Sequence, residues 1–93
     1  LIFRVEVTRS MIPLGDGVTE EIKKIAGSRS FEIFWGEDRS FVYLIGKFIT
    51  FESASEYASL LNRNGYRDAR VAGYLGYKEI PVEKAKQLFE KAE

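Results

Sequence analysis

The stretch that decides the fold is FVYLIGKFITFESASEYASLLNRNGYRDARVAGYLG, from Phe41 to Gly76. It begins with the apolar run Phe41–Ile45, which is typical of a β-strand. Thr50 is then placed to cap a helix over residues 51–64. The apolar residues of that helix recur at helical spacing and are Ala54, Tyr57, Ala58 and Leu61. Because Ala69–Tyr74 is again typical of a strand, the stretch predicts a strand, a helix and a strand.

The N-terminal part of the chain predicts the same kinds of element. Apolar and polar side chains alternate over Leu1–Thr8, and this period of two predicts a strand with one buried face. A helix is expected over Val18–Gly27, after a segment that contains a proline and two glycines. Ser30–Trp35 predicts a second strand, and a turn at residues 36–39 joins it in a hairpin to the strand that begins at Phe41.

The order of these elements predicts the fold class. Strand, helix, strand, strand, helix and strand is the pattern of an α+β, ferredoxin-like (RNP-like) βαββαβ sandwich. We expect a four-stranded antiparallel sheet with two helices on one face, and an open second face. A C-terminal helix follows at about 81–92, with Pro81 as its first residue. Ninety-three residues make a single domain, 1–93, with its core in residues 2–76.

Composition excludes several classes of function. Fourteen Lys and Arg residues balance fourteen Asp and Glu residues, so there is no basic excess for a nucleic-acid backbone. The chain has no cysteine and no histidine, which removes the usual nucleophiles, general bases and zinc ligands. We therefore predict no enzyme, no metal and no cofactor. No apolar run approaches the ~18 residues of a membrane span, and no signal segment is seen. We interpret the chain, which begins at Leu1, as an excised domain.

Strand alternation predicts which residues occupy the open face of the sheet. Every second side chain of a strand points away from the helices. Phe31, Ile33 and Trp35 are assigned to the core, although the opposite register of that strand would exchange Trp35 with Phe34. The open face is then expected to carry Arg4, Glu6, Thr8, Glu32, Phe34, Val42 and Leu44. An aromatic ring among polar groups suits a sugar, and an exposed apolar patch suits a protein partner.

The stretch from Phe41 to Gly76 also resembles the second half of the SPOR (sporulation-related repeat) domain. The shared marks are Gly46-Lys-Phe48, Thr50, Ala54, Gly65-Tyr66 and Ala69-Arg-Val71. The strand Phe3–Val7 is similar to the opening strand of that family, so the resemblance covers roughly Ile2 to Gly76. A helix after the last strand, as in Tyr77–Ala85, is similar to the tandem SPOR-like repeats of Bacteroidetes-type bacteria.

The resemblance implies a module of the bacterial cell envelope, or periplasm, that serves cell division. SPOR domains bind septal peptidoglycan, in particular glycan strands without stem peptides, through the open sheet face and its rim. The residues implied as ligand-binding are Arg4, Glu6, Thr8, Arg9, Phe34, Val42 and Leu44.

Two alternatives remain open at the level of the sequence. Glu6 stands where the family usually has Gln, and Val42 and Leu44 stand where it often has polar residues. The fold could therefore have lost glycan binding and serve as a protein–protein interaction domain that pairs with a protein, a second repeat or itself. An RRM-like nucleic-acid binder is the third interpretation, which the zero net charge disfavours.

Overall fold

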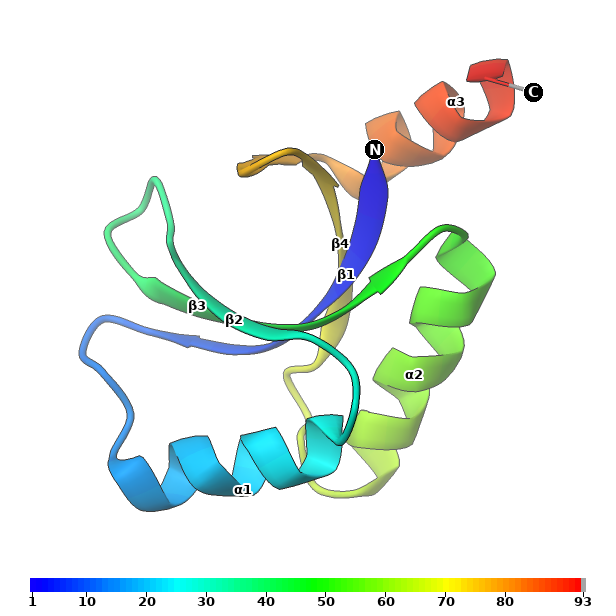
Figure 1. Ribbon diagram of the computed structural model, residues 1–93. Helices are drawn as coiled ribbons and strands as arrows, with labels where there is room; N and C mark the ends of the chain where they lie inside the picture. The colour runs from blue at the N-terminus through cyan, green and yellow to red at the C-terminus, as the bar shows by residue number, and fades with distance from the viewer. Residues whose placement is uncertain (93) are drawn as a thin grey trace.

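The computed structural model describes residues 1–92, with side chains described for residues 1–90 (Figure 1). Glu93, the last residue of the predicted domain, lies outside this range. The elements follow one another as β1 (Ile2–Ser10), α1 (Asp16–Ala26), β2 (Phe31–Trp35), β3 (Phe41–Phe48), α2 (Phe51–Arg63), β4 (Arg70–Leu75), β5 (Lys78–Ile80) and α3 (Val82–Ala92). Thr50 caps α2 as predicted, because its hydroxyl oxygen accepts a hydrogen bond from the Ser53 N–H at 3.2 Å.

Within the described residues, the strands form one antiparallel sheet in the order β2-β3-β1-β4-β5. This α+β arrangement is consistent with the predicted ferredoxin-like class, in which β1 lies between β3 and β4. The prediction of four strands is wrong, because β5 adds a fifth. Residues 76 and 77 turn the chain so that β5 pairs with β4, and Tyr74 lies opposite Glu79.

The main core lies between the sheet and its helices. Phe3, Val5 and Val7 of β1 point into it, as alternation predicts, and meet buried residues of α1 and α2. Ala85, Leu88 and Phe89 of α3 join the same core, and the Phe89 ring lies 6.4 Å from that of Phe3. All three helices therefore pack against this one core, and they leave the other face of the sheet to its own side chains.

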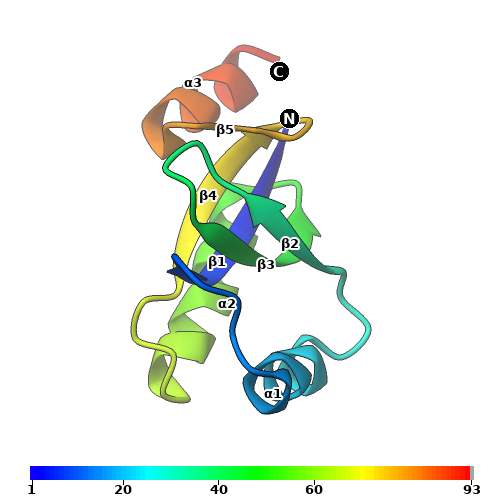
Figure 2. The same ribbon diagram turned by 90° about the vertical axis from the view of Figure 1, so that its left-hand side faces the viewer.

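Two irregularities in the β1–β3 pair curl the sheet. Phe3 lies opposite Phe48 but Val5 opposite Ile45, so β3 has one extra residue near Gly46. The second irregularity, between Glu6 and Thr8, gives β1 the extra residue. Such bulges bend strands and increase their twist. Figures 1 and 2 show the result, with the β2–β3 and β4–β5 hairpins curving toward each other over the face that carries no helix.

Because the sheet is curled, the side chains on the face that was predicted to be open form a second, smaller core. Val42, Leu44, Ala72 and Tyr74 are buried there, with Leu44 fully inaccessible, and Phe34 packs against them. Arg4 and Glu6 are buried on the same face. The prediction of an open face built from these residues is therefore wrong, because the hairpins shield the centre of the sheet from solvent.

The predicted register of β2 is confirmed, but not its burial. Phe31 lies opposite Ile45 and Phe34 opposite Val42, so the two sets of side chains occupy the faces that were assigned to them. Trp35 is nevertheless 61% exposed and Ile33 is 48% exposed. Both residues lie on an edge strand, which the helix layer does not fully cover, so their assignment to the core is wrong.

Candidate functional site

A cleft of about 810 Å³ opens on the concave face of the sheet. One wall is the end of β2 with the turn that follows it, residues 34–38. The other wall comes from residues 74–81, the β4–β5 hairpin and the start of the α3 connection. Arg9 and Val42 contribute to the floor. The cleft exists because the curled sheet brings two hairpins together that are 40 residues apart in the sequence.

Aromatic rings line the middle of the cleft. The Phe34 ring lies 5.5 Å from the rings of both Tyr74 and Tyr77, measured between centroids. Tyr74 is buried, and this burial together with nearby Glu79 and Glu6 raises the pKa of its phenol to about 12. Tyr77 is 85% exposed at the tip of the β4–β5 hairpin. Its ring is therefore accessible to a ligand, and it lies beside Phe34.

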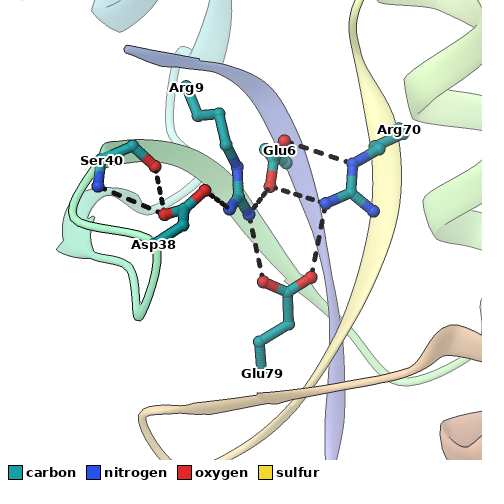
Figure 3. A network of polar contacts seen from close by, with 6 residues as sticks. All are labelled: Glu6, Arg9, Asp38, Ser40, Arg70 and Glu79. Atoms are coloured by element: carbon teal, nitrogen blue, oxygen red, sulfur yellow. Dashed lines mark hydrogen bonds and ion pairs between the residues drawn. The ribbon is translucent and has the colours of Figure 1, made fainter. Parts of the chain in front are cut away.

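A network of charged side chains joins the two hairpins (Figure 3), and three of its members, Arg9, Asp38 and Glu79, line the cleft. Arg9 lies at its centre and contacts Glu6 at 2.6 Å, Asp38 at 2.9 Å and Glu79 at 3.1 Å. Arg70 contacts the same Glu6 at 3.1 Å and Glu79 at 3.4 Å. The network links β1 and β4 to both hairpins. The hydrogen bond that Arg9 donates to the Glu6 carboxylate is the main reason that the pKa of Arg9 lies above its ordinary value.

The interactions of Asp38 in this network can be tested by measuring its pKa in solution. The pKa of Asp38 is lowered first by the hydrogen bond from the Ser40 hydroxyl, at 2.5 Å, and then by Arg9. A carboxyl group whose pKa is lowered in the folded protein stabilises that protein at pH values above its ordinary pKa of about 3.9. This stabilisation is lost as the pH falls through the lowered pKa. We expect Ser40→Ala to raise the Asp38 pKa toward its ordinary value in a carboxyl NMR titration. Ser28→Ala, at an exposed serine, is the control. An unchanged pKa in Ser40→Ala would assign the effect to Arg9 instead.

The structure separates the seven predicted site residues into three groups. Arg9, Phe34 and Val42 line the cleft. Arg4, Glu6 and Leu44 lie on the same face, but they are buried and do not line the cleft. Thr8 is on the opposite face, since the bulge places it across from Tyr43 and not on the Glu6 side. The prediction that Thr8 lies on this face is therefore wrong, because alternation assumes a regular strand.

The sequence reasoning missed the residues that come from the hairpin turns. Glu37, Asp38, Tyr77, Lys78 and Glu79 all line the cleft. The signal that could have identified the second turn is Gly76, which separates the strand-type run before it from the alternating residues 78–80.

A scan against protein-family models, a search of curated proteins and a search of solved structures found no match to this chain. The resemblance to SPOR domains therefore stays a prediction that rests on the marks within residues 41–76. Within residues 1–92, no helix has the length and apolar character needed to cross a membrane. The described part of the chain also brings no three acidic side chains together in a way that could hold a metal ion.

Proposed function

We propose that this domain is a non-catalytic binding module that takes a glycan strand of the bacterial cell wall into the cleft between the β2–β3 and β4–β5 hairpins. The observation that carries the proposal is the lining of the cleft. The exposed Tyr77 ring stands beside Phe34, and the charged groups of Arg9, Glu37 and Lys78 surround them. A sugar ring needs this combination, since its C–H face packs on an aromatic ring and its hydroxyls need donors and acceptors.

The SPOR-like marks supply the choice of sugar. In SPOR domains the ligand is peptidoglycan, and the site is the sheet face that carries no helix. The cleft lies on the corresponding face of this chain, above the buried Val42 and Leu44. We therefore move the proposed contacts from the centre of the sheet to the rim, to Arg9, Phe34, Tyr77 and Lys78. Location in the cell envelope is part of the same proposal.

The acidic side chains around the cleft favour a sugar over a nucleic acid. Glu37, Asp38 and Glu79 are three carboxylates, against the two cations Arg9 and Lys78. The charge of Arg9 is also balanced by Glu6, Asp38 and Glu79, which weakens its attraction to a phosphate but not its hydrogen bonding to a neutral sugar. A phosphate backbone would need a basic surface.

The proposal is tested by sedimentation of the purified chain with cell-wall sacculi, either untreated or treated with an amidase that removes stem peptides. We expect the wild-type chain to be retained, and more strongly after amidase treatment. Tyr77→Ala is expected to lower the affinity about tenfold, because a stacked aromatic ring contributes on the order of 1–1.5 kcal/mol. Because Tyr77 is so exposed, the variant should fold normally.

Ile49→Ala is the matched control for this experiment. Ile49 is another large exposed residue, but it lies between β3 and α2, outside the cleft. Its replacement should leave retention unchanged. If the folded wild-type chain were retained by neither preparation, glycan binding would be rejected. If both variants lost retention equally, the cleft would not be the site.

A further inference from the structure

β2 is an edge strand without the usual protection against pairing with another chain. It is the outermost strand, and its regular register with β3 covers Phe31 to Trp35. Natural edges are commonly blocked by lysine, proline, a bulge or an inward-pointing charge, and β2 has no lysine, proline or bulge. Its one charged residue, Glu32, turns to the concave face, where its carboxylate lies 2.7 Å from Arg4. The edge is therefore open to a further strand.

The backbone groups at this edge can be identified from the bonds on the other side of β2. The Gly46 N–H donates to the Ser30 carbonyl at 2.8 Å, and the Gly36 N–H donates to the Ser40 carbonyl at 2.8 Å. The backbone N–H and C=O groups of successive residues in a strand point to opposite sides, so those of the even-numbered residues of β2 bond to β3. The N–H and C=O groups of Phe31, Ile33 and Trp35 consequently point outward from the sheet.

We propose that this edge pairs with β2 of a second copy of the chain, antiparallel, about a two-fold axis at Ile33. In this register Ile33 faces its own symmetry mate, and Phe31 faces Trp35. Residues whose N–H and C=O groups point outward then face each other across the two copies. Each such pair can exchange two backbone hydrogen bonds, as the hydrogen-bonded pairs of an antiparallel sheet do. The side chains of Ile33 and Trp35, both exposed on the side of the helices, would be covered by the second copy.

Charge complementarity selects a second copy as the occupant. Arg29 and Glu37 lie just outside β2, two residues before Phe31 and two residues after Trp35. In an antiparallel pair about Ile33, the Arg29 end of each copy therefore meets the Glu37 end of the other. Both residues are exposed. Glu32 faces Phe34, so no two like charges face each other across the interface. Opposite charges across a strand pair stabilise it, and like charges destabilise it.

Sedimentation equilibrium of the chain over a range of concentrations tests the association. We expect a monomer–dimer equilibrium for the wild type. Ile33→Lys should raise the dissociation constant at least about tenfold, since it brings two cations together on the axis. Ile49→Lys, at an exposed isoleucine outside β2, is the matched control and should leave the constant unchanged. A wild-type chain that stays monomeric at millimolar concentration overturns the proposal, and so does a dimer that is indifferent to Ile33→Lys.

A charge-reversal pair tests the register. Arg29→Glu alone should weaken the dimer, because it places two carboxylates opposite each other at both ends. Adding Glu37→Arg should restore the wild-type dissociation constant to within a factor of about two to three. Weakening without restoration would overturn the register about Ile33. Glu37 also lines the cleft, but sedimentation equilibrium without glycan measures self-association alone, so failure here and failure of glycan binding remain distinguishable.

Discussion

Replacing Arg4 with alanine is expected to lower the free energy of unfolding by about 3–5 kcal/mol, mainly because alanine leaves a cavity in place of a large buried side chain. Arg4 is only 2% exposed. Its Nε donates to the Gly46 carbonyl at 3.0 Å, its Nη1 lies 2.7 Å from Glu32, and its guanidinium lies 5.3 Å from the centre of the Phe34 ring. Alanine would leave the Gly46 carbonyl without its donor and a cavity beneath Phe34. Urea unfolding measures the loss.

Arg4→Met is the control that separates volume from charge. Methionine fills most of the same space but carries no charge. Glu32 is about one-third exposed and can turn to water once the pair is gone. Arg4 Nη2 has no hydrogen-bond partner among the described residues, so part of its desolvation is not compensated. We therefore expect a loss of at most about 2 kcal/mol for Arg4→Met. An equal loss in both variants would show that the charge, and not the packing, holds this face together.

The order of elements could be predicted because its signals are local. Alternation in β1, the Thr50 cap and the helical spacing of residues 54–61 each depend on a few neighbouring residues, and the structure confirms all of them. The fifth strand escaped prediction because three residues, Lys78–Ile80, are too short to show a period.

The position of the site could not be predicted because it depends on two bulges. Side chains of β1 alternate between the two faces as far as Glu6, and the bulge then shifts the alternation. Thr8 therefore lies on the helix side, and Arg9 lies on the concave face. A bulge depends on pairing with another strand, and β1 by itself carries no sign of it. The curl that follows from the bulges also covers Leu44.

The burial of charged residues on the concave face also depends on the pairing of distant strands, and so it could not be predicted from one strand alone. Polar residues of an alternating strand are expected in solvent, and Arg4 and Glu6 were assigned there. Their partners come from distant strands: Glu32 lies beside Arg4, and Arg70 beside Glu6. A charge can be buried when it is paired, but its partner is known only once the strands are in register. The polar centre of this face thus supports the cleft, and the proposed ligand contacts lie at its rim.

Gly46→Ala is expected to destabilise the protein by about 2–4 kcal/mol, measured by the same urea unfolding. Gly46 is at the β3 bulge with φ of +77°, a region that costs other residues about 1–2 kcal/mol. A Cβ there would also press against the Phe48 ring, and crowding of this kind typically costs about 1–3 kcal/mol. Because the Gly46 carbonyl accepts from Arg4, any shift of the bulge also disturbs the buried guanidinium.

Substitutions at two other glycines separate the cost of backbone strain from the cost of crowding against the Phe48 ring. Gly65→Ala has the same kind of backbone strain, with φ of +101°, but no described atom lies within 4 Å of the added Cβ. We expect it to cost only the strain, about 1–2 kcal/mol. Gly17→Ala lies in α1 with open space around it and should stabilise the helix by about 0.5–1 kcal/mol. If Gly46→Ala cost no more than Gly65→Ala, the Phe48 ring would be free to move aside. The bulge would then not be locked against Arg4, and the curvature that forms the cleft would have to depend on the hairpins and their ionic network instead.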